Sequence, residues 1–249
     1  MEYPVCLLRL WAIFACRMPV TMADIIELAP GALHERAAAR LRTMLVEGHI
    51  APGAKLNERE LAQALNLSRT PLREAIKMLA TEGLVDLLPN RGAVAVKLTE
   101  ADVKHSFELL AELEGLAGEL AAQRIDDATR AELRAKHFEM LACHARRDLS
   151  GYYRLNALIH AGINAAAGNP VLASTYAKVN ARVQSLRFRT NQNDSKWQRA
   201  MAEHGRMIDA LDQRDGPALR AVLKLHLEHK RDTVLELMRA GTLQQGRPA

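Results

Sequence analysis

Apolar residues recur at the spacing of an amphipathic helix where the patterned part of the chain begins. The predicted helix covers residues 33–47, and its apolar face comprises Leu33, Ala37, Leu41, Met44 and Leu45. The same spacing returns in a second apolar face, which comprises Leu72, Ala75, Ile76, Leu79 and Ala80. Gly83 ends this second predicted helix. Each of the two helices therefore has one face that must pack against another part of a domain.

Capping residues predict a short helix between these two. Asn57 begins a capping-box pattern, and the helix that it opens runs to residue 65. Asn66 stands where the chain must leave this helix, and asparagine tolerates the left-handed conformation better than most residues. Pro71 places the first turn of the next helix, because proline is tolerated only there. Ser68 then stands where it can cap this helix. The short helix and its successor are therefore joined by a tight turn.

Two β-prone runs follow these helices. They cover residues 84–88 and 93–96, and the turn residues between them predict a hairpin. A long helix, two helices joined by a tight turn, and a hairpin make a winged helix-turn-helix when they occur in this order. We place this domain at residues 31–97.

Cations lie on the face of the third helix that is opposite its apolar face. Arg69, Arg73 and Lys77 recur there every four residues. A recognition helix in the major groove needs this arrangement, because its donors must face phosphates and base edges. Such cations are often only a solvated surface, but here cap, turn, helix and wing accompany them. The predicted DNA-binding residues are Arg59, Ser68, Arg69, Thr70, Arg73, Arg91 and Gly92.

Helical patterns alone continue from residue 98 to about residue 240. A capping signal at Thr99 opens the first helix, which runs to about Arg124. The later predicted helices cover about 128–147, 149–167, 170–189, 195–213 and 217–239. The predicted fold class is therefore mainly α, with an all-helical effector-binding bundle at 98–240 after the winged domain.

The two ends of the chain fall outside these patterns. Residues 1–30 are interpreted as a disordered extension or a start assigned too early, because Met18 and Met22 lie just before the first patterned helix. The apolar stretch Val5–Cys16 is a poor signal peptide, since an arginine interrupts it. Residues 241–249 form a short tail. We therefore expect a cytoplasmic protein.

Composition narrows the class of protein further. The chain has 49% apolar and 25% charged residues, which is ordinary for a globular protein and excludes a disordered chain. It contains no run of eighteen apolar residues, so no membrane partner is expected. Its three cysteines indicate neither a disulfide framework nor a cysteine metal site. The net charge of +5 is only a mild indication of a polyanionic partner.

Four residues of the bundle could ligate one metal ion. Asn156 and His160 share a helix face, and His204 and His226 belong to two later helices. Three imidazoles and one oxygen donor suit Zn²⁺, Ni²⁺ or Mn²⁺, and no organic cofactor is indicated. From spacing alone, a packed or surface position is the commoner explanation of such a histidine. The remaining histidines are interpreted as surface or packing residues: His34, His49, His105, His137, His144 and His229.

The N-terminal motifs resemble those of a known family. They are Asn57-Glu58-Arg59-Glu60-Leu61-Ala62, Leu67-Ser68-Arg69-Thr70-Pro71-Leu72-Arg73-Glu74-Ala75, Glu82-Gly83-Leu84-Val85 and Asn90-Arg91-Gly92-Ala93. Over about 65 residues the chain resembles the DNA-binding domain of GntR-family transcriptional regulators. Asn66 stands where the family usually has glycine, and it suits the same backbone. Two winged domains related by a twofold axis would bind double-stranded DNA at a palindromic operator, so a homodimer is expected.

Motifs in the bundle resemble the FCD-type effector domain of the FadR subgroup of this family. They are Tyr153-Arg154-Leu155-Asn156-Ala157-Leu158-Ile159-His160, Ala167-Gly168-Asn169-Pro170, Glu203-His204 and Leu225-His226-Leu227. The resemblance implies that an Asp and three His hold a metal to which a small carboxylate effector binds. Asn156 replaces that Asp here. Because an amide carries no charge, we expect weaker metal binding or a different choice of metal.

A second departure concerns the anion partner of the effector. The family often has an arginine in the first helix of the bundle, at a position that Leu110 takes here. Arg182, Arg187 and Arg189 are then the candidate effector-binding cations, although an arginine on a helix is usually solvated.

Two functions fit these features. The first is a ligand-responsive transcriptional regulator, expected to be a repressor and not an enzyme. The second is a metal-dependent hydrolase that uses the three histidines. A hydrolase needs a general base beside the metal. Glu203 is a poor base, because adjacent residues on a helix point about 100° apart and Glu203 therefore points away from the side of His204. A helix-turn-helix also has no role in a hydrolase, so regulation is the predicted function.

Overall fold

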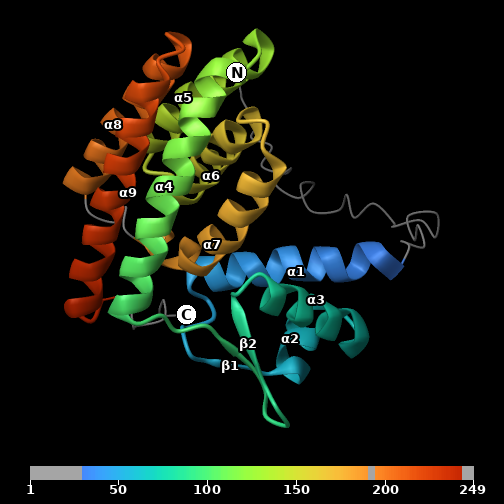
Figure 1. Cartoon of the computed structure of the whole chain (residues 1–249). Coiled ribbons are helices and arrows are strands. Elements are labelled where there is room, and N and C mark those ends of the chain that lie inside the picture. Colours follow the sequence, from blue (N-terminus) through green and yellow to red (C-terminus); the bar gives the residue numbers. More distant parts are fainter. Residues whose placement is uncertain (1–29, 190–193, 243–249) are drawn as a thin grey trace, which may run out of the picture.

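The computed structural model describes residues 30–189 and 194–242 of the chain (Figure 1). The extension predicted for the first thirty residues lies outside the described residues except for Pro30, and so does the tail beyond residue 242. The described elements are α1 (Pro30–Glu47), β1 (Lys55–Leu56), α2 (Glu58–Leu65), α3 (Arg69–Thr81), β2 (Val85–Leu88), β3 (Gly92–Ala95), α4 (Glu100–Arg124), α5 (Asp127–Ala145), α6 (Leu149–Ala166), α7 (Pro170–Arg189), α8 (Asp194–Asp212) and α9 (Gly216–Arg239).

Local capping explains where the helices of the N-terminal part begin and end. The Asn57 side chain accepts the backbone N–H groups of Arg59 and Glu60, which fixes the start of α2. Asn66 leaves α2 in the left-handed conformation, at φ 53° and ψ 50°, as predicted. Ser68 occupies the N-cap position of α3, but its side chain makes no capping hydrogen bond there, so that part of the prediction is wrong.

A three-stranded antiparallel sheet completes the winged helix-turn-helix. Its strand order is β1-β3-β2, with Val85 opposite Ala95 and Leu88 opposite Gly92 in the hairpin. The turn of the hairpin is possible because Asn90 and Gly92 both adopt positive φ. Strand β1 was not predicted, because a strand of two residues is too short to show an alternating pattern.

The core of the winged domain lies between α1, α3 and the sheet. Its largest fully buried side chains come from α1 and α3: Leu41, Leu72 and Leu79. At the edge of this core Arg42 forms a two-pronged ion pair with Glu82, with N–O distances of 2.6 and 2.9 Å. The predicted apolar faces of both helices are therefore the ones that pack together.

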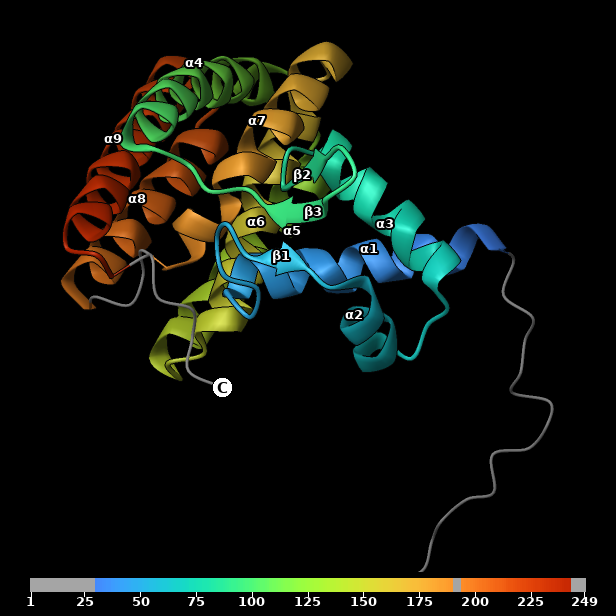
Figure 2. The ribbon, with the colours of Figure 1, turned by 90° about the horizontal axis from the view of Figure 1, so that it is seen from below.

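Helices α4 to α9 form the second part of the molecule, an all-helical bundle (Figure 2). Thr99 opens α4 with a full capping box, in which its side chain and that of Asp102 exchange hydrogen bonds with the backbone. Helices α4 and α9 pack along each other, and α5 packs against α6. The mainly α fold class is thus confirmed. Among the described residues, no helix is long and apolar enough to cross a membrane.

Helix α7 connects the bundle to the winged domain (Figure 1). Its Ala181 packs against the buried core of the winged domain, and its Phe188 packs with Val46 of α1 and Tyr153 of α6. Gly83 lies so close to α7 that a Cβ atom at this position would stand 2.9 Å from Cγ of Arg182. The two parts of the molecule therefore meet at a packed interface.

Candidate metal centre and nucleic-acid interface

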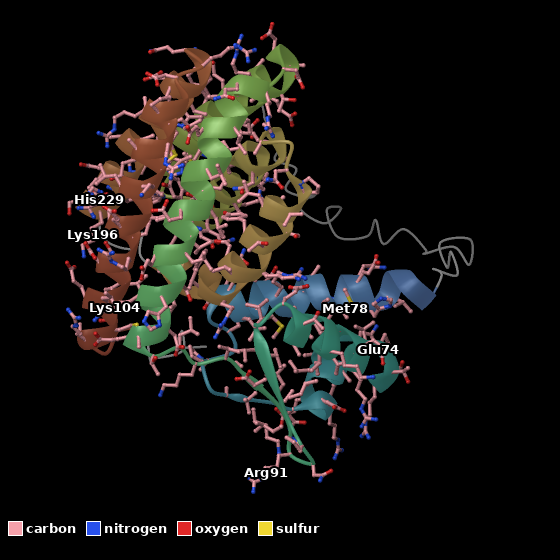
Figure 3. All side chains as sticks on the ribbon, in the orientation of Figure 1. Glu74, Met78, Arg91, Lys104, Lys196 and His229 are labelled. Atoms are coloured by element: carbon pink, nitrogen blue, oxygen red, sulfur yellow. The ribbon has the colours of Figure 1, made fainter. Side chains whose placement is uncertain are left out.

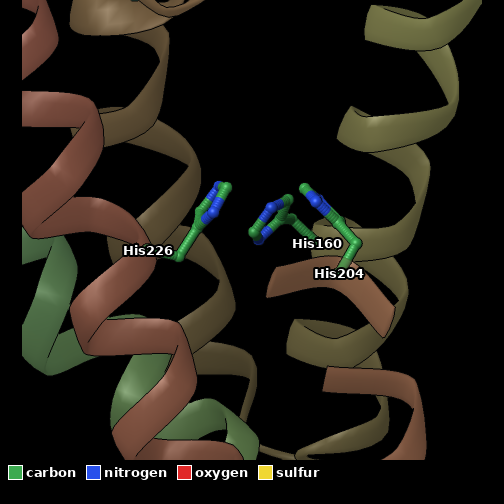
Figure 4. Close-up of side chains that lie close together, drawn as sticks. All are labelled: His160, His204 and His226. Carbon is green, nitrogen blue, oxygen red and sulfur yellow. The ribbon is translucent and has the colours of Figure 1, made fainter. Parts of the chain in front are cut away.

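Three histidines meet in the interior of the bundle, one each from α6, α8 and α9 (Figure 4). His160, His204 and His226 are at most 1% exposed, and their candidate ligand atoms lie within 4.8 Å of one another. The ring centroids are 4.9 to 5.4 Å apart. Helices that are distant in sequence thus bring the predicted histidines together.

The outer nitrogen of each ring is held by a hydrogen-bond acceptor. Nδ1 of His160 lies 2.7 Å from Oε2 of Glu114, and Nδ1 of His226 lies 2.6 Å from Oε2 of Glu203. Nδ1 of His204 lies 2.7 Å from the backbone oxygen of Ala200. A carboxylate or carbonyl accepts a hydrogen, so these contacts assign the ring proton to Nδ1.

The inner nitrogens are left with their lone pairs. Nε2 of His160, His204 and His226 is buried in each case and has no hydrogen-bond partner in the described structure. Three buried lone pairs that converge on one point are costly unless a cation or a donor satisfies them. Neutral imidazoles in this arrangement are the ligands that a divalent transition metal prefers.

Burial also sets the charge of two of these rings. It lowers the pKa of His204 and of His226 well below the usual value, and the neighbouring imidazoles lower both further. Both rings are therefore neutral at neutral pH. A histidine must be neutral to bind a metal, so no proton has to be displaced from either ring.

The carboxylate behind His160 is itself part of a buried ion pair. Glu114 is 1% exposed, and its Oε1 lies 3.5 Å from Nη1 of Arg187. The Arg187 Nη1 also donates to Asn180, at 2.6 Å. Burial by itself raises the pKa of the Glu114 carboxyl, but His160 and Arg187 outweigh burial and hold that pKa below its usual range. Glu114 is therefore an ionised anchor for His160.

The carboxylate behind His226 holds a second histidine as well. Oε1 of Glu203 lies 2.6 Å from Nδ1 of His229, while its other oxygen faces His226. His229, interpreted from the sequence as a surface or packing residue, is partly exposed and contacts this buried carboxylate. Glu203 does point away from His204, as its place on α8 predicted, and it reaches α9 instead.

Asn156 lies one helical turn before His160 on α6. It is 6% exposed, so it is buried on the face of α6 that carries His160. The structure thus keeps Asn156 and the three histidines inside the bundle.

The three candidate arginines of α7 have different surroundings. Arg187 is buried in the bundle beside Glu114, whereas Arg182 is exposed and lines a cavity of about 110 Å³ with Lys97 of the winged domain. Arg182 therefore lies at the interface between the two parts and not among the buried residues of the bundle. The side chain of Arg189 lies outside the described residues.

The bundle also contains a buried lysine that was not predicted as a site residue. Lys230 lies one turn after His226 on α9, is 8% exposed and shares a small pocket with Glu203 and His229. Burial, with the charge of Arg187, lowers its pKa to about 7. The signal was present in the sequence, since residues 226 and 230 share a helix face.

The predicted DNA-binding residues come from α2, from α3 with its N-cap, and from the hairpin, where Figure 3 labels Arg91. Arg59, Ser68, Arg69, Thr70, Arg73, Arg91 and Gly92 are all exposed. Arg73 pairs with Glu58 of α2, with an Nε–Oε2 distance of 2.7 Å. Arg91 stands at the tip of the hairpin, away from the bundle. This arrangement leaves the exposed face of α3 and the wing accessible to a groove of DNA.

Two family models match the chain. The model described as bacterial regulatory proteins, gntR family, matches residues 33–94, and the FCD domain model matches residues 105–229. The first range contains the predicted DNA-binding residues, and the second contains the three clustered histidines.

Curated relatives of the chain are named as transcriptional regulators. The chain is 26% identical to the HTH-type transcriptional repressor RspR of Escherichia coli K12, over 79% of this chain and 86% of that protein. It is 30% identical to the Nta operon transcriptional regulator of Aminobacter aminovorans, over 81% of this chain and 94% of that protein. A probable D-xylose utilization operon transcriptional repressor of Paenarthrobacter nicotinovorans is 26% identical, over 76% of this chain and 85% of that protein.

Solved structures share the fold. McbR/YncC of Escherichia coli superimposes with a TM-score of 0.74 at 20% identity, over 83% of this chain and 98% of that chain. A GntR transcriptional regulator from Rhodococcus sp. RHA1 gives a TM-score of 0.68 at 21% identity, over 82% and 98% of the two chains.

Proposed function

Because the chain belongs to the GntR family of bacterial regulatory proteins and carries an FCD domain, it regulates transcription through DNA, and we propose that it acts as a homodimeric repressor released by a small carboxylate. The proposed effector site is the metal centre of the bundle. The proposed location of the protein is the cytoplasm, where its operator lies.

One observation carries the effector site, namely the three buried Nε2 lone pairs of His160, His204 and His226. Zn²⁺, Ni²⁺ or Mn²⁺ fits this donor set, and Asn156 is the proposed fourth ligand. When bound, the metal would supply a positive charge that attracts the effector's carboxylate. The proposed role of Glu114 and Glu203 is to fix the ring orientation and the Nδ1 protons of His160 and His226.

The charge balance of the site favours an anionic ligand. Three neutral imidazoles and an amide leave both charges of a divalent metal uncompensated by its direct ligands. The carboxylates of Glu114 and Glu203 stand behind the histidines and face their outer nitrogens. Arg187, one of the three candidate effector-binding cations, adds positive charge in the same region, and Lys230 does so when it is protonated.

Replacing Asn156 by aspartate is expected to tighten Zn²⁺ binding at least about tenfold and to weaken the binding of a carboxylate. The added charge attracts the metal but cancels part of the attraction for the effector. Competition with a chelating dye measures the first change, and thermal shift with small mono- and dicarboxylates measures the second. Asn164→Asp, on the same helix and also buried, is the matched control. Unchanged Zn²⁺ affinity in Asn156→Asp would remove Asn156 from the ligand set.

A metal-dependent hydrolase is the less favoured function. Its general base would have to face a metal-bound water, but both oxygens of Glu203 already contact histidine Nδ1 atoms. The matched relatives are named as transcriptional regulators, which supports a binding role for the centre.

Helix α7 is the proposed route by which the metal centre influences the winged domain. It carries Arg187 beside Glu114 at one site and Ala181 with Arg182 against the winged domain at another. A shift of α7 would therefore change the contacts at both sites, because both are tightly packed.

Replacing Arg182 by alanine is expected to reduce the coupling between the two sites by about 0.5–2 kcal/mol. Affinity for Zn²⁺ and affinity for DNA without Zn²⁺ should each stay within a few-fold of the wild type, because Arg182 contacts neither ligand in this proposal. Fluorescence anisotropy with and without Zn²⁺, on an operator selected by the protein from random DNA, measures the ratio of affinities. Lys178→Ala on the exposed side of α7 is the control. An unchanged ratio in Arg182→Ala would rule out this route.

The function as a whole is tested with the purified full chain. Mass spectrometry of the native protein reports whether a transition metal co-purifies. A gel shift on the selected operator, with and without the small carboxylates that raise the melting temperature, reports release from DNA. A metal-free protein that a carboxylate still releases would refute the metal-centred effector site. A protein that selects no DNA sequence would contradict the regulatory role.

A further inference from the structure

A cavity lies where the winged domain, the segment that connects it to α4, and helices α7 and α9 meet. We call it the interdomain cavity, and its volume is about 110 Å³. A water molecule takes up roughly 30 Å³ in the liquid. Pockets for drug-sized ligands measure about 300–1,000 Å³, so this cavity has room only for a small solute.

Two cations line the interdomain cavity from different parts of the molecule. Lys97 belongs to the connecting segment, and Arg182 belongs to α7. Both side chains are exposed, so a solute can reach them from the solvent. Ser185, three residues after Arg182 on α7, adds a hydroxyl group to the lining. The polar groups of this cavity are therefore mainly hydrogen-bond donors of positive charge.

These two cations lack a carboxylate partner within the chain. Among residues 30–189 and 194–242, no carboxylate forms an ion pair with Lys97 or with Arg182. Most exposed cations of the bundle are paired, as Arg220 is with Glu112 and Glu119. Two like charges beside one cavity repel each other, and an anion between them would replace this repulsion by attraction.

Asp102 is the one acidic group that interacts electrostatically with Arg182. Hydrogen bonds from Thr99, and to a smaller extent the charge of Arg182, hold the pKa of Asp102 below its usual value. The Oδ2 atom of Asp102 accepts both the backbone N–H and the hydroxyl of Thr99, at 2.9 and 2.6 Å. This carboxylate therefore caps α4, and with two cations nearby it leaves positive charge in excess at the cavity.

The rest of the cavity wall is apolar. It is made by side chains from both parts of the molecule, namely Pro52, Val96, Leu98, Leu186 and Met238. A binding site for a small molecule typically combines such a wall with a few polar groups that fix the ligand. A ligand with a charged group and a short apolar part would contact both kinds of surface.

We propose that the interdomain cavity binds one small anion, a phosphate or a short-chain carboxylate, between Lys97 and Arg182. The proposal goes beyond the proposed function, because the site uses neither the three histidines nor a metal. The bound anion contacts the connecting segment on one side and α7 on the other. It therefore holds the winged domain against the bundle, and it stabilises the folded chain by binding to it.

Calorimetric titration and thermal shift of the full chain test the proposal. The protein is first stripped of metal with phenanthroline, a neutral chelator, and is kept free of phosphate and carboxylate buffers. Inorganic phosphate and butyrate are then titrated separately, and butyramide serves as the uncharged counterpart of butyrate. At least one of the two anions is expected to bind with a dissociation constant of about 1 mM or tighter and to raise the melting temperature. Butyramide should do neither.

The two anions distinguish the sources of the charge. Phosphate offers charge and acceptor oxygens alone, whereas butyrate adds an apolar chain that can contact the cavity wall. The anion that binds more tightly identifies which of the two chemistries the site takes.

Replacing Arg182 or Lys97 by glutamine is expected to weaken binding of that anion at least about tenfold, because each change removes one charged donor. A Cβ atom at Gly83 would stand 2.9 Å from Cγ of Arg182, so this stem packs on the winged domain, and glutamine retains its Cγ. Arg154→Gln on α6 and Lys104→Gln on α4 are the matched controls, since each removes the same charge from an exposed position. Both should bind the anion like the wild type.

Circular dichroism and the melting temperature without anion identify any variant that fails to fold. If Arg182→Gln fails, Lys97→Gln still tests the site, because Lys97 lies outside the helices and strands. A wild type that binds neither anion overturns the proposal, and so does binding that survives both glutamine variants. Binding that is lost in His204→Ala would place the anion at the three histidines and overturn it as well. Since the test uses neither metal nor DNA, failure of the proposed function would leave its outcome unchanged.

Discussion

Replacing His204 by alanine is expected to lower the affinity for Zn²⁺ by more than about 100-fold, since loss of an outer partner alone costs about 10–100-fold. His204 is fully buried, and its ring centroid lies 5.3 Å from that of His160 and 4.9 Å from that of His226. Its Nδ1 contacts only the backbone of its own helix, so the substitution leaves no carboxylate without a partner. Removal of His160 or His226 would instead take away one of the buried partners of the Glu114 or Glu203 carboxylate.

The same variant is expected to retain DNA binding in the absence of carboxylate, because α3 and the wing do not contact the histidines. Metal content by mass spectrometry and titration with a chelating dye measure the loss. His144→Ala is the control, since His144 is a half-buried histidine of the bundle that packs edge-on against Trp197 at 4.6 Å. Undiminished Zn²⁺ affinity in His204→Ala would show that the three histidines do not form a metal site.

Replacing Arg73 by alanine is expected to weaken binding to the selected operator by about 1–3 kcal/mol, or roughly 5–150-fold. Arg73 is exposed on α3, and its partner Glu58 is the only group that its guanidinium contacts in the described ion pairs. That partner lies on α2, so the pair holds the guanidinium near the outer surface of the helix-turn-helix. A guanidinium in this position can donate to both acceptors of a guanine in the major groove.

Fluorescence anisotropy at one fixed salt concentration measures this loss, since phosphate contacts depend strongly on salt. Lys104→Ala removes an exposed cation from α4 and is the control for net charge (Figure 3). Arg69→Ala belongs in the same series, because it occupies the preceding turn of α3. If neither arginine variant loses affinity while Lys104→Ala also stays unchanged, the recognition face has been assigned to the wrong helix surface.

The helices and most of their ends follow from local sequence. Asn57, Asn66 and Thr99 were readable as caps because capping involves hydrogen bonds within four residues of the chain. The three histidines could also be named in advance, on the strength of a family resemblance combined with helix-face spacing. β1 was missed because its two residues form a strand only through pairing with β3, almost forty residues later.

The polar groups that support the histidines are brought to them only by the packing of the helices. Glu114 and His160 are 46 residues apart, and Glu203 and His226 are 23 residues apart, so no periodicity of one helix relates them. The surroundings of Arg182 and Arg187 could not be predicted from the sequence either, although both residues belong to α7. Residues five apart on a helix point in different directions, but the sequence does not say which direction meets the bundle and which meets the winged domain. That choice depends on how α7 packs between the two, because burial is a property of the neighbouring elements and not of the helix itself.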